Sequence, residues 1–200
     1  MYALVEDNTI TKIYNNPRGM TLGGVQYPQN IHSLWLESDL NAIGIYTVIY
    51  DDTNKKAEEW YTNTDQTFTF AGGVVTATYG TATAKAIEDR NGTDEDGVEL
   101  DPVVVIKGLK TIKKEIFDRQ AAGFLAKYDW YVIRNTEAST AIPSAITDYR
   151  TAVRTKCNSM QVQIDGAANV DALAALFTYT KTDGVTSRPL GEWPDDPNEE

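Results

Sequence analysis

The chain has 200 residues, a formal net charge of −11, and a hydrophobic fraction of 42% that includes 10% aromatic residues. This composition can build the core of one large domain or two small ones. The negative charge repels phosphate backbones, so we expect no nucleic-acid partner. No apolar run approaches the roughly 18 residues of a membrane span, and the N-terminus does not resemble a signal peptide, so we expect no membrane partner.

The N-terminal part of the chain predicts short strands joined by tight turns. Three pairs of strands flank turn-forming dipeptides: Tyr2–Val5 and Ile10–Tyr14 around Asp7-Asn8, Met20–Leu22 and Val25–Tyr27 around Gly23-Gly24, and Gln66–Phe70 and Val74–Tyr79 around Gly72-Gly73. Such dipeptides between alternating apolar residues are typical of β-hairpins. We therefore predict a β-rich domain over residues 1–85.

A short helix and a buried strand are predicted between the second and third hairpins. Ser38 can cap the helix, Leu40 and Ile43 would face inward, and Gly44 would end it. The apolar run Ile45–Tyr50 then predicts a buried strand.

Residues 86–102 change the character of the chain. This segment is rich in aspartate and glutamate, contains two glycines and has little apolar periodicity. These features are typical of an exposed linker between domains. We therefore predict that it separates the β-rich domain from a C-terminal domain.

The C-terminal part predicts helices. Apolar residues recur at helical spacing from about Val104 to Tyr128, and again from Pro143, at the first helical turn, to about Ile164. A polar loop separates them, so we predict a helical hairpin, followed by a short helix over Val170–Phe177 that Asn169 caps. The helical domain covers 103–180, and residues 181–200 form an extended, Pro-rich acidic tail with Trp193 as an anchor. The fold class is α+β.

No residue pattern predicts catalysis, a cofactor or a metal site. His32 is the only histidine and Cys157 the only cysteine, so a zinc site lacks its ligands, and nothing local places His32 within hydrogen-bond reach of a nucleophile, as a hydrolytic triad requires. Cys157 falls on an apolar helical stripe and is predicted to be a buried structural thiol. The acidic run Asp89–Asp101 does not fit the spacing of a calcium loop. We therefore predict a protein that is not an enzyme.

The stretch Leu125–Arg154 is the strongest candidate for partner binding. It gathers aromatic and arginine side chains, the types enriched at binding hot spots: Trp130, Tyr131, Arg134, Tyr149, Arg150 and Arg154. Arg150 and Arg154 lie four positions apart and would share a helix face. The alternative is that Trp130 and Tyr149 only close the hairpin core, with solvated arginines.

The same stretch resembles tail-fibre assembly chaperones and related tail proteins of bacteriophages. The resemblance is carried by Leu125, Asp129, Trp130, Arg134, Ile142, Pro143, Tyr149, Arg150 and Arg154. In that pattern a helix ends in Asp-Trp, a polar loop carries an arginine, and Ile-Pro opens the next helix. The N-terminal part is similar to small tail-region proteins of marine phages, through Leu22–Pro28, Leu34-Trp35, Ala42–Tyr46 and Ala77–Thr83.

The resemblance implies a non-enzymatic tail protein that binds other tail or tail-fibre proteins. It would act as an adaptor in the tail or baseplate, or as a chaperone of tail-fibre assembly, as a homo-oligomer or in a larger assembly. It would be found in the virion tail, or in the host cytoplasm during assembly. Two alternatives remain open: a host-directed binding module that uses its acidic surface, and a small hydrolase with a carboxylate-based site.

Overall fold

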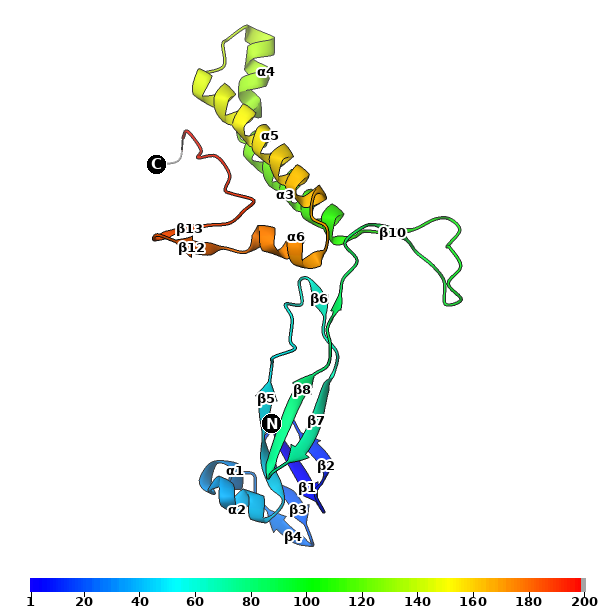
Figure 1. The fold of residues 1–200 in the computed structure, drawn as a ribbon. Helices are drawn as coiled ribbons and strands as arrows, with labels where there is room; N and C mark the ends of the chain where they lie inside the picture. Colours follow the sequence, from blue (N-terminus) through cyan, green and yellow to red (C-terminus); the bar gives the residue numbers. More distant parts are fainter. Residues whose placement is uncertain (199–200) are drawn as a thin grey trace. The chain divides into compact units, whose positions relative to one another are not determined.

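The computed structural model describes residues 1–198 and has the predicted α+β fold. The chain divides into two compact units, Met1–Thr83 and Ala84–Glu200. Unit 1 contains the three predicted β-hairpins, and unit 2 contains the helical hairpin and the short third helix (Figure 1). The division comes at the end of the predicted β-rich domain.

A five-stranded sheet forms the centre of unit 1. Its order is β2-β1-β5-β8-β7, with β5 parallel to β8 and all other neighbours antiparallel. The strands are β1 (Tyr2–Glu6), β2 (Thr9–Tyr14), β5 (Ile45–Asp51), β7 (Gln66–Ala71) and β8 (Val74–Tyr79). Asp7 and Asn8 have φ of 48° and 62°, which is the left-handed geometry of a tight hairpin turn. The antiparallel pairing of β1 with β2 and of β7 with β8 confirms the first and third predicted hairpins.

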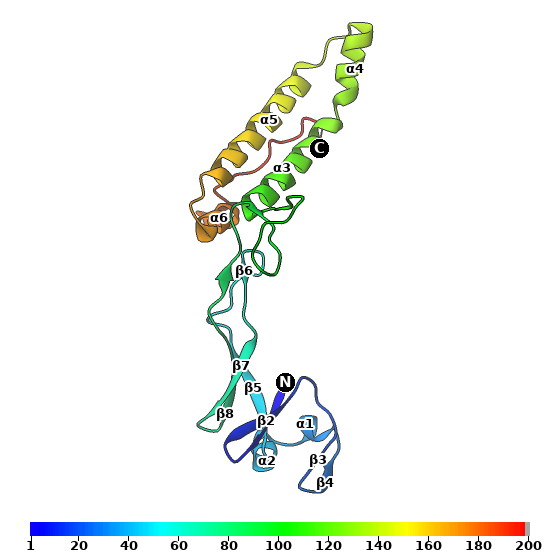
Figure 2. The ribbon, with the colours of Figure 1, turned by 90° about the vertical axis from the view of Figure 1, so that its right-hand side faces the viewer.

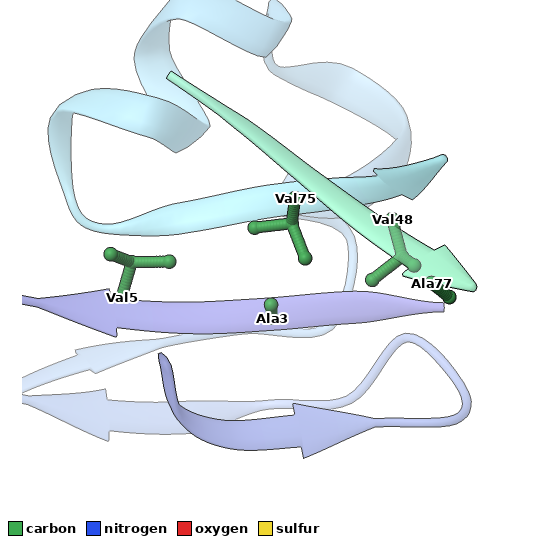
Figure 3. Packing of buried hydrophobic residues seen from close by; sticks show 5 residues of the cluster. All are labelled: Ala3, Val5, Val48, Val75 and Ala77. Atoms are coloured by element: carbon green, nitrogen blue, oxygen red, sulfur yellow. The ribbon is translucent and has the colours of Figure 1, made fainter. Parts of the chain in front are cut away.

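The sheet curls, so that side chains on one of its faces pack against each other. Contacts join β2 and β7, which are at opposite ends of the strand order. Ala3 and Val5 of β1, Val48 of β5, and Val75 and Ala77 of β8 form the buried cluster on this face (Figure 3). Small and β-branched side chains suit the inside of a curled sheet, because they let neighbouring strands approach closely.

Helices and a further hairpin cover the opposite face. Leu4 and Ile45 pack there with Ile31 and Leu40. Ile31 comes from α1 (Ile31–Leu34), which was not predicted, and Leu40 from α2 (Glu37–Ala42). The second predicted hairpin, β3 (Met20–Leu22) with β4 (Val25–Tyr27), adds Met20, Leu22 and Tyr27. The predicted cap is wrong: α2 begins at Glu37, so Ser38 lies inside the helix and Leu36 takes the capping position without a side-chain hydrogen bond.

Gly44 lies between α2 and β5, as predicted. Its φ is +83°, and a Cβ atom there would lie 2.7 Å from the carbonyl oxygen of Val5. Its own carbonyl accepts a 2.8 Å hydrogen bond from the Val5 amide. This part of the chain also has two short strands, β6 (Tyr61–Thr62) and β9 (Thr83–Ala84). The first residue of β9 is the last of unit 1.

The acidic segment 86–102 folds within unit 2. It lies largely between β10 (Arg90–Asn91) and β11 (Val105–Ile106), which pair antiparallel. The Asp94 carboxylate accepts hydrogen bonds from the amides of Asp96 (3.0 Å) and Val98 (2.9 Å), which turns the chain. The predicted linker is therefore largely a loop whose two ends are paired as short strands, and it is not an extended spacer.

Two long helices, α3 (Leu109–Ala126) and α5 (Ser144–Asp165), lie side by side in unit 2 (Figures 1 and 2). Phe117 and Ala121 of α3 are buried, as is the stripe Ile146, Tyr149, Val153, Cys157, Met160 and Ile164 of α5. The short α6 (Val170–Phe177) follows, and its predicted cap is confirmed: the Asn169 side chain accepts a 2.8 Å hydrogen bond from the Ala172 amide.

A separate helix, α4 (Asp129–Ala138), occupies most of the predicted loop between the long helices. The prediction that this region is a polar loop is wrong. The Thr136 hydroxyl donates a 3.0 Å hydrogen bond to the Val132 carbonyl one turn earlier, so this polar side chain finds its partner within the helix. The helix ends at Ser139, whose φ is +51°.

The C-terminal part forms a hairpin and then returns to the long helices. Strands β12 (Thr180–Thr182) and β13 (Val185–Ser187) pair antiparallel. Beyond them, Leu190 is completely buried, and Trp193 packs against Phe117 and Phe124 of α3. The prediction that Trp193 anchors the tail is confirmed. Glu199 and Glu200 of the predicted tail lie outside the described residues.

Candidate protein-binding surface

Three of the six predicted partner-binding residues lie on α4. They are Trp130, Tyr131 and Arg134, and all three stand in the first two turns of this helix. The resemblance had placed Trp130 at the end of a helix and Arg134 in a loop. The helix has no buried residue. Trp130 is 49% exposed, and its neighbours Val132 and Ile133 are 40% and 56% exposed. These apolar side chains give α4 an uncovered surface.

Arg134 organises the aromatic side chains of α4. The carbon of its guanidinium group lies 4.8 Å from the centre of the Trp130 ring and 5.4 Å from that of Tyr131. Its Nε atom is buried and has no hydrogen-bond partner among the described residues. Stacking on two rings holds the guanidinium in place through cation–π attraction. The result is a surface in which two rings and a cation have fixed positions.

Tyr149 and Arg150 belong to the hairpin interior. Tyr149 is buried, and its ring meets that of Tyr128 edge-on, with 5.6 Å between ring centres. Arg150 donates a 2.6 Å hydrogen bond to the Leu125 carbonyl and forms a 2.9 Å ion pair with Asp129. The two side chains therefore tie α5 to the junction of α3 and α4. For Tyr149, this is the core role that the alternative interpretation assigned to it.

Arg154 separates from Arg150 despite the four-residue spacing. It is exposed, and its Nη1 donates a 3.3 Å hydrogen bond back to the Arg150 carbonyl. Arg150 turns inward because a carbonyl and a carboxylate from another segment meet it there. The two arginines lie four positions apart on α5, as predicted, but Arg150 is buried and Arg154 is exposed, so the interpretation of solvated arginines holds for Arg154 alone.

The sequence analysis missed several exposed apolar residues. Val132 and Ile133 continue the surface of α4. At the end of α1 and before α2, Leu34, Trp35 and Leu36 are 73%, 40% and 71% exposed. The ring of Trp35 meets Tyr27 edge-on at 5.9 Å between centres. The signal in the sequence was the presence of two short apolar runs, residues 34–36 and 132–133, with no helical periodicity around them. Exposed apolar patches of this kind mark sites of protein contact.

The two candidate catalytic side chains have structural surroundings. His32 stands at the start of α1, its ring 4.3 Å from that of Tyr2 between centres. Cys157 is buried as predicted, and burial, followed by the charge of Asp118, raises the pKa of its thiol. Such a thiol carries little of the reactive thiolate.

Within residues 1–198 there is no group of three or more His, Cys, Asp or Glu side chains positioned to hold a metal ion. Over the same residues, no helix combines the length and apolar character needed to cross a membrane. No protein-family model, curated protein or solved structure matches the chain.

Proposed function

We propose that this chain is a non-enzymatic bacteriophage tail protein that acts by binding other proteins. It serves as an adaptor in the tail, baseplate or tail fibre, or as a chaperone of tail-fibre assembly. The observation that supports this proposal is helix α4, which exposes Trp130, Val132 and Ile133 and buries none of its side chains. The sequence resemblance to tail proteins includes Trp130 and Arg134 of the same helix.

A short helix that packs none of its side chains against the rest of the chain has little stability of its own. An isolated helix of 10 residues is marginal in water, because short helices gain most of their stability from packing an apolar face. α4 packs few of its side chains within the described chain. A partner that covers Trp130 and Ile133 would bury apolar area at roughly 25 cal/mol per Å² and order the helix. The Trp130–Arg134 pair supplies two residue types that dominate binding energies.

The first test asks where the chain is found. Quantitative mass spectrometry of purified virions would detect it at a fixed ratio to the tail proteins if it is an adaptor. An assembly chaperone would be absent from virions and abundant in lysate of infected cells. Absence from both samples contradicts the proposed function.

The second test asks whether α4 is the binding surface. Co-purification of tail proteins with the tagged chain should fall at least tenfold for Trp130→Ala, because a hot-spot truncation costs about 2 kcal/mol or more. Val162→Ala is the matched control, since Val162 is 71% exposed on α5 and far from Trp130 in sequence. Equal losses in both variants, or no loss in either, would rule out α4 as the contact.

A further inference from the structure

The segment 188–198, here called the strap, follows β13 and lies along the α3–α5 hairpin (Figure 2). Its first anchor is Leu190, whose side chain is completely buried and whose carbonyl accepts a 2.6 Å hydrogen bond from Lys156 Nζ. Its second anchor is Trp193. The centre of that ring lies 5.2 Å from the ring of Phe124, and the indole N–H donates a 3.0 Å hydrogen bond to Gln120.

The third anchor of the strap is Asp196. Its side chain is 7% exposed and forms a 2.7 Å ion pair with Lys127 Nζ. It also accepts hydrogen bonds from the Tyr128 hydroxyl and, at 2.9 Å, from the Asn198 amide. Burial alone would raise the pKa of Asp196, but the bonds from Lys127 and Tyr128 outweigh burial and lower the pKa to about 2. Asp196 is therefore held as a carboxylate.

The three anchors recur at every third residue, Leu190, Trp193 and Asp196, among three prolines. A three-residue period is the one that extended, Pro-rich segments use to present side chains on one side. Such segments lose little conformational entropy on binding, because proline restricts the free chain. The strap thus has the composition of an extended recognition peptide.

The strap does not fill the surface on which it lies. A cavity of about 610 Å³ opens between α5 and the strap residues Glu192 and Pro194. A second cavity of about 360 Å³ is lined by Phe124 and Tyr149 on the hairpin and by Trp193 to Asp196 on the strap. Both hollows are open to solvent, so residues 192–198 leave part of this surface of the hairpin uncovered.

Charge favours an acidic occupant at this surface. The chain has a net charge of −11, yet the hairpin presents Lys127 and Lys156 to the strap. Phe117 and Phe124 of α3 provide the aromatic contacts of the Trp193 ring on the same hairpin. An occupant that complements this surface needs an aromatic side chain and a carboxylate at the spacing of Trp193 and Asp196.

We propose that this surface of the α3–α5 hairpin is a docking site for an extended acidic segment of a partner protein, one that carries an aromatic residue and a carboxylate three positions later. Residues 192–198 occupy the site in cis and must be displaced, while Leu190 stays in place as a permanent part of the core. The proposal rests on the protein-binding function proposed above. A tethered segment acts at an effective concentration in the millimolar range, so the strap suppresses weak competitors.

The experiment uses the chain's own segment as the probe. Truncation after Gly191 keeps Leu190 and its bond to Lys156 and removes the two displaceable anchors. A fluorescently labelled peptide of residues 191–200 should bind this truncated chain, and at least tenfold more weakly the full chain, by fluorescence anisotropy. Circular dichroism and thermal unfolding verify that the truncated chain is folded.

A second variant guards against misfolding of the truncated chain. The full chain with Trp193→Ala and Asp196→Asn keeps its backbone and should also bind the wild-type peptide. If either folded variant fails to bind the peptide, or if the unmodified full chain binds it equally well, the docking site is refuted.

Charge reversal tests where the peptide binds. Lys127→Glu in the truncated chain should reduce peptide affinity at least tenfold, and a peptide with Asp196→Lys should restore it. Lys181→Glu, on exposed β12, is the matched charge control and should leave affinity unchanged. Trp130→Ala should also leave peptide binding unchanged, so this proposal and the one for α4 can fail separately.

Discussion

The two units bury their apolar residues by different routes. In unit 1, a curled sheet and the short elements inserted between its strands cover both faces. In unit 2, two long helices leave apolar side chains that the C-terminal segment covers through Leu190 and Trp193. A sheet can close on itself by curling, whereas a pair of helices needs a further layer. The last residues of the chain provide part of that layer.

The short helices of the two units show the same contrast. α2 has six residues and places Leu40, which is 4% exposed, in the core of unit 1. α4 has ten residues and buries none of them. Length alone therefore does not decide whether a helix packs. The apolar side chains of α4 have no role in the core of the chain, and this supports the binding role proposed for them.

One of the two largest predicted effects on stability tests whether the C-terminal segment completes the core of unit 2. Leu190→Ala should lower the free energy of unfolding by about 2–5 kcal/mol, because it removes a completely buried side chain and leaves a cavity. Urea unfolding followed by the helical circular dichroism signal measures the loss. Leu34→Ala, at a position 73% exposed in unit 1, is the control and should change stability by less than about 0.5 kcal/mol. If Leu190→Ala is as stable as the wild type, the conclusion that Leu190 stabilises the core of unit 2 is wrong.

A second prediction concerns the sheet of unit 1. Gly44→Ala combines a backbone strained at φ +83° with a Cβ atom 2.7 Å from the Val5 carbonyl oxygen. We expect it to destabilise the chain by about 1–3 kcal/mol, the range of a forced unfavourable backbone conformation. Gly73→Ala has a similar φ of +78° but no atom within 4 Å of the added Cβ. Thermal unfolding should therefore show the smaller loss for Gly73→Ala, and the reverse order would refute the role of the Val5 contact.

Features decided by a few neighbouring residues could be predicted from the sequence. The Asp7-Asn8 turn and the Asn169 cap were found because their backbone geometry or hydrogen bonds lie within a few positions of the signal. The stripe of α5 was found because helical periodicity repeats over many residues. The fold class followed from these local features taken together.

Features decided by distant residues were missed. Arg150 turns inward because its partners, the Leu125 carbonyl and Asp129, come from the end of α3 and the start of α4. Periodicity along α5 cannot reveal those partners. The helix α4 was missed for a local reason: Asn135 and Thr136 favour loops on propensity, yet both lie within the helix. Half of the predicted binding residues therefore lie on a helix that was not expected.

A smaller effect is expected from protonating one anchor of unit 2. The pKa of Asp196 is about 2 in the folded chain and 3.8 without its partners, so its carboxylate stabilises the docked strap above about pH 4. This stabilisation is lost as the pH falls from about 4 through 2. The indole N–H resonance of Trp193 should shift towards its free position over this range, while Leu190 stays buried.

Asp196→Asn separates this titration from that of other carboxylates. In the variant the Trp193 resonance should already be shifted at pH 7 and should change little between pH 4 and 2. A wild-type resonance that is constant over the same range would show that Asp196 does not hold the strap.

The smallest effect on stability is predicted for Trp130, an aromatic residue of unit 2 that is 49% exposed. Trp130→Ala should change the free energy of unfolding by less than about 0.5 kcal/mol, since its ring contacts are with Tyr131 and Arg134 of the same exposed helix. Tyr149→Ala should cost about 3–5 kcal/mol, because the Tyr149 ring is buried against Tyr128. The two aromatic residues were grouped as one candidate site from the sequence, and denaturation of the two variants divides them. A large loss for Trp130→Ala would mean that α4 packs within the chain, and its apolar surface would then give no reason to expect a partner.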